Sequence, residues 1–281
     1  MLITCSNFAT LVVMGKRSSP QGLWKSFKNV KFLWFFVLLL VFPSFPKRVM
    51  AQPVGTGTVA TMDQAIAILN MARLNYQKVQ DYECLLVKQE RVNGILFPES
   101  MVTMRGRCKP LSLYLRWEGT GPDKGMEVSY VEGRNHGMMR VRPPGLLGVL
   151  GFWSVSTRDP RVFEKNRHSI TEAGLGTLLE TTSHYWEMER RLDRTEVHIS
   201  DDEIGGRICT RIETIHPDRN AGPYYGYRCV LWIDKTTLLP LGAEMYDWPR
   251  IGGNKNGDLL ESYRYLNLRF NIGLGDSAFV R

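Results

Sequence analysis

The strongest constraint on the fold is a series of short segments in which apolar and polar residues alternate. In the clearest one, LSLYLRWE, one face carries the apolar side chains of Leu111, Leu113, Leu115 and Trp117. The polar residues between them share the other face, as expected for a strand with one buried and one wet side. This period of two is typical of an antiparallel sheet that is covered on one side only.

Ten such segments are bounded by turn residues, and we predict a strand for each of them. They cover residues 82–91, 101–108, 111–118, 126–132, 136–141, 196–200, 208–215, 225–234, 239–247 and 260–270. Their close spacing indicates one large antiparallel sheet.

Helical periodicity interrupts the strands in two places. Thr61 and Gln64 have the spacing of a capping box, followed by apolar residues at helical intervals to about residue 80. Asp159 and Pro160 can start a short helix that continues to residue 167, and Thr171 can cap a longer one over residues 172–192. We therefore expect a mainly β fold with helices (α+β): a curved antiparallel sheet, or incomplete barrel, of about ten strands whose concave face the helices cover.

The first 51 residues have the pattern of an export signal. Basic residues precede the apolar run FLWFFVLLLVF, residues 32–42, and small residues then predict cleavage after Ala51. The alternative is a retained membrane anchor, but an apolar run of eleven residues is short for a bilayer, which takes about 20. We expect an exported, periplasmic or otherwise extracytoplasmic protein, with a flexible leader at 52–60 and one domain at 61–281.

The basic charge of the chain belongs to this predicted signal. Residues 1–51 carry seven of the 36 Lys and Arg residues and none of the 28 acidic ones, so the remainder has a net charge of only +1. A nucleic-acid-binding domain usually has a clear basic excess. The composition therefore argues against a nucleic-acid partner.

Four cysteines follow the predicted signal, an even number that favours disulfides in an exported protein. The midpoint of Cys84 and Cys108 falls in one predicted turn, and the midpoint of Cys209 and Cys229 falls in another. We therefore predict the disulfides Cys84–Cys108 and Cys209–Cys229, each across its own hairpin. The alternative is four buried free thiols, and the wide cysteine spacing argues against structural zinc.

The C-terminal third resembles the LolA family of lipoprotein carriers. Members have a strand that ends in Asp, a Leu-Pro that opens the next strand, and a last strand followed by Asn and then Asp-x-x-Phe. The matching residues here are Asp234, Leu239, Pro240, Asn271, Asp276 and Phe279. The segments DYECLLVKQERVNG, RCKPLSLYLRW and RHSITEAGLG also resemble an uncharacterised family of secreted proteins in planctomycete-like bacteria, which is usually placed beside LolA.

The resemblance implies an incomplete barrel with a helical lid over a cavity for acyl chains. Leu113, Leu115 and Trp117 are then candidates for the cavity lining. The arginine that is central to lipoprotein transfer in LolA has no match in this sequence, so the transfer activity is not carried over.

An uncharged segment, PPGLLGVLGFWSV, covers residues 143–155. It has too much glycine and proline for a regular helix, and it lacks strand alternation. We expect it either to form a flexible lid that touches lipid or to pack over the open end of the sheet as core. Its candidate contact residues are Leu146, Leu147, Val149, Leu150, Phe152 and Trp153.

The sequence shows no pattern of catalytic or metal-binding residues. The five histidines are scattered without metal spacing, and no nucleophile elbow occurs. Arg167 and His168 approach a predicted helix start, where they could bind an anion, although a plain capping segment is the simpler interpretation. We therefore predict no metal, no cofactor and no enzymatic activity.

The leading hypothesis is an extracytoplasmic, non-enzymatic protein that binds or carries acyl chains of a lipid or a lipoprotein anchor. Peripheral contact with a membrane is part of this prediction. The alternative is an envelope module that binds a protein or senses stress with the same fold, and a hydrolase has the least support.

Overall fold

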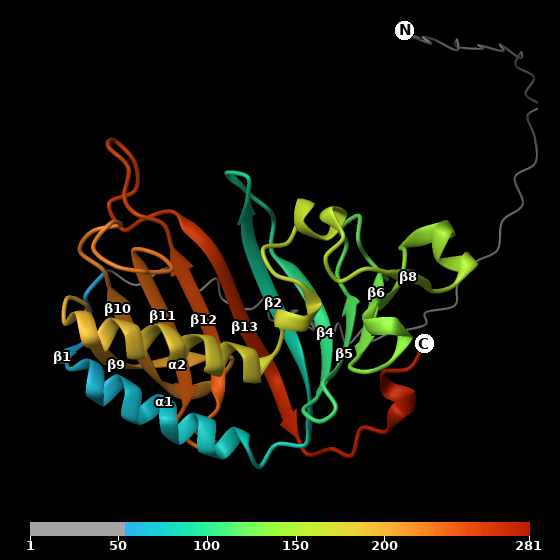
Figure 1. The fold of residues 1–281 in the computed structure, drawn as a ribbon, viewed down its shortest axis with the longest axis horizontal. Coiled ribbons are helices and arrows are strands. Elements are labelled where there is room, and N and C mark those ends of the chain that lie inside the picture. The colour runs from blue at the N-terminus through green and yellow to red at the C-terminus, as the bar shows by residue number, and fades with distance from the viewer. Residues whose placement is uncertain (1–53) are drawn as a thin grey trace, which may run out of the picture. The chain divides into compact units, whose positions relative to one another are not determined.

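A single open sheet is the frame of the molecule. In the computed structural model, which describes residues 54–281, thirteen strands pair antiparallel throughout in the order β1-β9-β10-β11-β12-β13-β2-β4-β5-β6-β7-β8, with β3 on β2. The strands are β1 (Thr58–Ala60), β2 (Asp81–Val92), β3 (Ile95–Leu96), β4 (Ser100–Arg107), β5 (Ser112–Trp117), β6 (Glu127–Val131), β7 (Met139–Arg142), β8 (Trp153–Val155), β9 (Glu196–Ile204), β10 (Arg207–Ile215), β11 (Arg228–Asp234), β12 (Pro240–Tyr246) and β13 (Leu259–Phe270). β1 and β8 are the two edges, so the sheet is not a closed barrel (Figure 1).

All ten predicted strands are present with small shifts at their ends, and the predicted fold class is confirmed. The sequence does not reveal β1, β3 or β8, because strands of two or three residues are too short to show an alternation. The prediction of a flexible leader is wrong at Thr58–Ala60, which pairs as β1 with β9.

The predicted export signal and its cleavage after Ala51 lie outside the described residues. The described residues fall within one compact unit. Among residues 54–281, no helix is long and apolar enough to cross a membrane.

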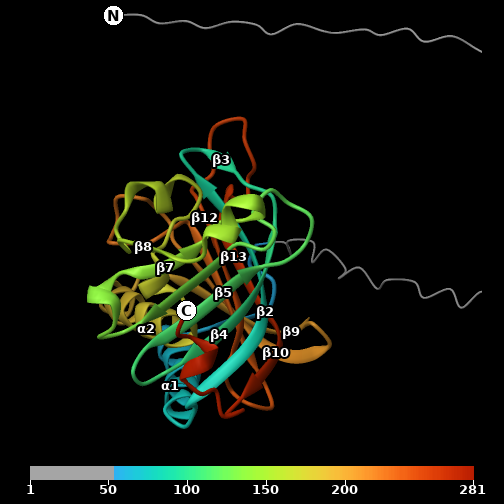
Figure 2. The same cartoon turned by 90° about the vertical axis from the view of Figure 1, so that its right-hand side faces the viewer.

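Two α-helices cover one half of the sheet. Helix α1 (Met62–Tyr76) begins at the predicted capping box, in which Gln64 N donates to Thr61 Oγ1 and Thr61 N donates to Gln64 Oε1. Helix α2 (Leu175–Leu192) begins three residues later than predicted, because its N-cap is Gly174 instead of Thr171. The helices lie side by side across β9–β12, on the side toward which the β7–β8 end of the sheet bends (Figures 1 and 2).

The remaining helical turns are of the 3₁₀ type and lie in connections. They are η1 (Asn135–Gly137), η2 (Gly145–Leu150), η3 (Pro160–Glu164), η4 (Ile170–Glu172) and η5 (Asp276–Ala278). The predicted cap at Asp159 is present, because its carboxylate accepts from Arg161 N at 3.0 Å. The predicted short helix after it is η3.

Apolar packing joins the helices to the sheet. Leu69 of α1 and Leu179 of α2 are fully buried, in one cluster with Ile212 and Leu231 of the sheet. A larger cluster continues over β2, β4 and β5 and includes Leu175 at the start of α2. Burial of each leucine-sized side chain contributes about 1.5–3 kcal/mol, so this packing holds both helices against the sheet.

The alternation predicts that the polar face of β5 is wet, but the C-terminal segment covers part of it and leaves Arg116 exposed. Ser112 and Tyr114 are buried, and Phe279 packs with Tyr114 without any exposed surface. Asp276 in the same segment binds Arg107 and Arg134, each at 2.7 Å. The alternation within β5 does not reveal this contact, since a distant part of the chain supplies the cover.

The predicted disulfides are absent, and the four cysteines within residues 54–281 are free thiols. In the register of β2 with β4, Cys84 faces Met104, four residues before Cys108. Likewise Cys209 faces Asp234, five residues after Cys229. At about 3.3 Å per residue these offsets exceed the Cα separation of about 7 Å that a disulfide tolerates. The centres of both hairpins lie about two residues away from the predicted midpoints, and this shift accounts for both wrong pairings.

Candidate functional site

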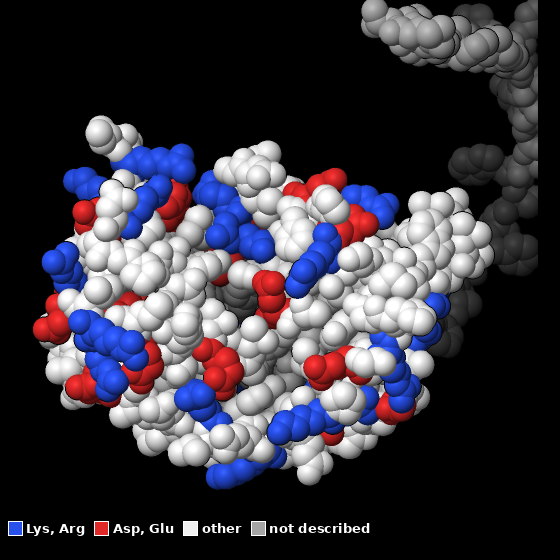
Figure 3. All heavy atoms as spheres, in the orientation of Figure 1, with Lys and Arg blue, Asp and Glu red and all other residues white. Residues whose placement is uncertain are grey.

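The uncharged segment forms a tip that extends from the β8 edge of the sheet. Its turn η2 exposes Leu146 (91%), Val149 (81%), Leu150 (69%) and Leu147 (57%). Trp153 is also exposed at the base of the turn, and Phe152 is half-buried. We call residues 145–153 the apolar projection; it is the white extension on the right of Figure 3. Of the two expectations for this segment, packing as core is wrong, because these side chains do not contact a core.

The backbone of the apolar projection is held in a defined turn. Gly148 O accepts from Gly151 N at 3.1 Å and from Arg142 Nε at 3.0 Å. A side chain at Gly148 would meet Pro143 O at 2.6 Å, and Gly151 has a left-handed φ of 84°. The glycines are therefore required by the shape of the turn, which the sequence alone interprets as flexibility.

The three residues predicted to line a cavity lie elsewhere, in the larger apolar cluster. Leu113 has no exposed surface, and Leu115 and Trp117 pack against the same cluster while half-buried. They do not meet the apolar projection in a common site. The structure thus separates the two groups that the resemblance would combine in one cavity.

A buried charged cluster, which sequence reasoning missed, lies on the face of the sheet that carries α2. Glu90 of β2 and Glu261 of β13 are directly opposite each other in the register and are only 4% and 2% exposed. Two adjacent buried carboxylates repel, so they require nearby positive charge.

The positive partners of Glu261 come from residues 156–174, which run from β8 to α2 in front of the sheet; we call them the crossing segment. Arg167 Nε donates to Glu261 at 2.9 Å, and His168 Nε2 lies 2.9 Å from the same carboxylate oxygen. On the other carboxylate, Lys88 Nζ donates to Glu90 at 3.0 Å. Tyr263 Oη also donates to Glu90. Every carboxylate of this cluster is therefore hydrogen-bonded.

The ion pairs of the cluster shift the pKa values of Glu261 and His168. Burial would raise the pKa of Glu261, but hydrogen bonding by His168 and the charges of His168 and Arg167 hold that pKa below its ordinary value. Burial would lower the pKa of His168, but the bonds to Glu261 and Glu172 raise that pKa above 6.5. For both groups the hydrogen bonds and opposite charges within the cluster therefore outweigh the effect of burial.

These bonds also answer the question of anion binding. Arg167 and His168 turn toward the sheet and bind Glu261, so neither is directed at the start of α2 as the sequence suggests. A narrow hollow over β13 is visible in Figure 3, with acidic and basic side chains on part of its rim and uncharged residues on the rest.

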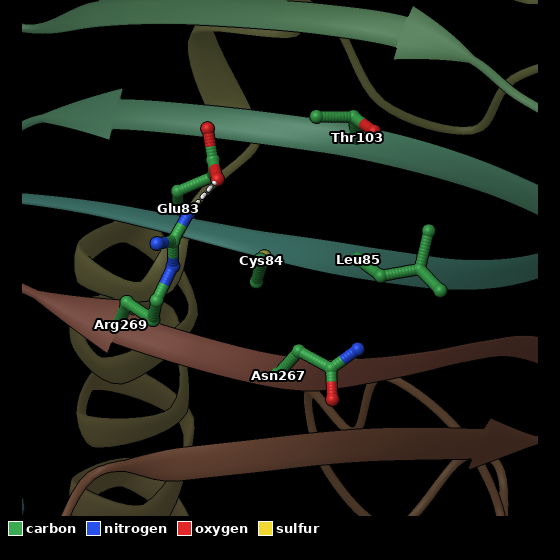
Figure 4. Close-up of a pocket in the computed structure, with 6 residues that line it drawn as sticks. All are labelled: Glu83, Cys84, Leu85, Thr103, Asn267 and Arg269. Carbon is green, nitrogen blue, oxygen red and sulfur yellow. Dashed lines mark hydrogen bonds and ion pairs between the residues drawn. The ribbon is translucent and has the colours of Figure 1, made fainter.

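A shallow pocket of about 330 Å³ lies on the opposite face of the sheet (Figure 4). Its lining is polar, and Glu83 in it binds both Arg105 and Arg269. The hydrogen bond from Arg105 lowers the pKa of Glu83, so this charge is satisfied within the protein. Among residues 54–281, no group of three or more His, Cys, Asp or Glu side chains could hold a metal ion.

Comparisons with known proteins add the family and some similar folds. No curated protein matches the chain. Similar solved structures include a putative outer membrane lipoprotein-sorting protein domain from Vibrio parahaemolyticus, with 12% identity, a TM-score of 0.38 and coverage of 78% of this chain and 97% of that one. The lipoprotein LppX from Mycobacterium tuberculosis has 14% identity, a TM-score of 0.42 and coverage of 76% and 98%.

A LolA superfamily protein from Nitrosomonas europaea is also similar, with 12% identity, a TM-score of 0.28 and coverage of 79% of this chain and 98% of that one. At such identities these similarities say nothing about what this chain binds. The family model described as "Protein of unknown function (DUF1571)" matches residues 79–281, which is most of the chain, and the protein therefore belongs to that family.

Proposed function

We propose that this protein is a non-enzymatic binding protein for acyl chains that acts outside the cytoplasm, where the predicted export signal would place it. The observation that carries the proposal is the exposure of four large aliphatic side chains in one turn, η2. Covering them in a partner would contribute on the order of 6–12 kcal/mol, at about 1.5–3 kcal/mol for each. An exposed group of this kind usually marks a binding surface.

The interior supports contact at the surface of the molecule. One half of the covered face is filled by the apolar packing of α1 and α2, and the other half contains the charged cluster under the crossing segment. The apolar projection is the part of the described chain whose chemistry best suits hydrocarbon. We therefore assign acyl-chain contact to it instead of to Leu113, Leu115 and Trp117.

Native mass spectrometry of the exported protein tests the proposal. We expect a bound mass in the lipid range that organic extraction removes, and we expect its loss when Leu146, Leu147, Val149 and Leu150 are all replaced by serine. The control is Leu74→Ser on α1, a leucine with 59% exposure in a different region. A clean mass that persists after incubation with mixed lipids would refute acyl-chain binding.

A protein partner is the second candidate function. The apolar packing under α1 and α2 together with an exposed apolar tip is also the arrangement expected of an interaction module. In that case the exported protein shows no lipid mass, and crosslinking in cells through a photoreactive residue at position 147 yields one defined protein band. The serine variant would lose that band.

A further inference from the structure

We infer that the apolar projection is a membrane-insertion element, which enters the surface of a phospholipid bilayer. This inference rests on the proposed function and names the source of the acyl chains. Its basis is the order in which three kinds of side chain follow one another from the tip of the turn back to β7. Aliphatic side chains form the tip, Phe152 and Trp153 follow at the base, and Arg140 and Arg142 of β7 lie behind them.

The layers match the structure of a membrane surface. Aliphatic side chains favour the hydrocarbon, tryptophan favours the level of the headgroups, and arginine favours the phosphates. Arg140 Nη2 donates to Phe152 O at 3.2 Å, and Arg142 Nε donates to Gly148 O at 3.0 Å. These bonds connect the basic layer directly to the base of the tip, and they satisfy carbonyls that would otherwise lose water on insertion.

The shape of the apolar projection favours a bilayer over a protein groove. Leu146 and Val149 are the most exposed of its side chains and stand on a narrow 3₁₀ turn. A convex tip can enter a soft surface and contact acyl chains there, whereas a protein partner must offer a groove shaped to receive it.

The local charge is complementary to anionic phospholipid. Arg140, Arg142 and Arg281 lie at this edge, and the facing carboxylate is Glu127, which binds Arg142 at 3.0 Å and lies 3.9 Å from Arg281. These three basic groups outnumber the carboxylate that they face. We expect anionic headgroups to strengthen the contact, because basic residues near such a surface are attracted to it.

The direction of the strands adds a second contact. Since neighbouring strands are antiparallel, the connections β2–β3, β7–β8 and β12–β13 leave from the same end of the strands; the first and the last are seen at the top of Figure 1, and the β7–β8 connection is seen on the right. Ile95 is exposed in β3, next to the first connection, and Ile251 in the last is fully exposed between Arg250 and Lys255. A bilayer that receives the apolar projection would therefore meet these hairpin tips as well.

Vesicle sedimentation tests the inference. The exported protein should pellet with phosphatidylcholine vesicles and more strongly with vesicles that also contain phosphatidylglycerol. The double variant Val149→Glu/Leu150→Glu should bind about tenfold more weakly, because charges enter hydrocarbon poorly. The matched control is Leu74→Glu on α1, which should bind like the parent. Ile251→Glu should give a smaller loss, since it removes only the second contact.

A depth measurement separates insertion from adsorption. Lipids with bromine on the acyl chains should quench tryptophan fluorescence of the parent, and Trp153→Phe should remove most of that quenching. If the parent binds lipid in native mass spectrometry but does not pellet with vesicles, membrane insertion is wrong while the proposed function stands. If both measurements are negative, both proposals fail. Equal losses in the Leu74→Glu control would also overturn the assignment to this turn.

Discussion

The charged cluster and the apolar projection differ in how their side chains are exposed to water. The cluster buries Glu90 and Glu261, which water solvates well, and supplies their partners from within the chain. The apolar projection exposes leucine and valine side chains, which water solvates poorly, and the described residues supply no cover for them. The charges of the cluster are therefore satisfied within the chain, whereas the apolar projection would be stabilised by an external partner that covers it.

The largest expected effect comes from removing a charge from the cluster. Glu261→Gln leaves Arg167 and His168 beside an uncharged amide in a buried position. Breaking a buried ion pair costs about 3–5 kcal/mol, so we expect a loss of this order in the free energy of unfolding by urea. The control Glu180→Gln removes the exposed pair with Arg73 and should cost less than about 1 kcal/mol. Equal losses would mean that burial does not distinguish the cluster.

Removing one neutral donor should have an intermediate effect. Tyr263→Phe deletes the hydroxyl that donates to Glu90 and leaves the ring in place. A buried acceptor that loses a partner costs about 1–3 kcal/mol, measured by the same unfolding experiment. A neutral result would show that Lys88 alone satisfies Glu90.

The cluster should also make stability depend on pH. The pKa of His168 is raised, so its contribution is complete below its ordinary value of 6.5 and disappears as the pH rises through the raised pKa. The pKa of Glu261 is lowered, so its contribution is complete above its ordinary value of 4.5 and disappears as the pH falls through the lowered pKa.

The stability difference between the parent and His168→Gln should therefore be greatest between pH 4.5 and 6.5 and should decrease at higher pH. Urea unfolding at a series of pH values measures it. His184→Gln, at an exposed histidine of α2, is the control. A difference that does not change with pH would place the role of His168 in packing instead of charge.

The smallest expected effect on stability comes from the apolar projection. Replacing Leu146, Leu147, Val149 and Leu150 together by serine should change the free energy of unfolding by less than about 1 kcal/mol, because exposed substitutions cost little. The buried substitution Leu179→Ala should cost about 2–5 kcal/mol. A large loss in the serine variant would mean that the turn is part of the core, and the contrast between the two regions would disappear.

The strands could be predicted because period-two patterning is local. The cluster could not, because Arg167 and Glu261 are 94 residues apart and meet only through the sheet register. One signal was available: Glu90 and Glu261 occupy inward positions of their strands, where an acidic residue needs a partner. An acidic residue at an inward position of a covered strand therefore indicates a buried ion-pair cluster.

The residues that carry the family resemblance proved to be structural. Asp234 accepts hydrogen bonds from the backbone of Thr236 and Thr237, and Asn271 accepts one from Gln80 N. Phe279 is buried beneath the outer face of β5. Such residues shape turns and docking contacts, so they identify a fold well and predict a ligand poorly.

The order of strands has a consequence for how the chain is made. β2 is an early strand, but its neighbour in the middle of the sheet is β13, the last one. A polypeptide that emerges from its N-terminus therefore presents β2 with one side unpaired until Leu259–Phe270 arrives. Pairing over such a separation is slow, and an open strand edge invites association with other chains. Protection by a holding chaperone would be most valuable in this interval.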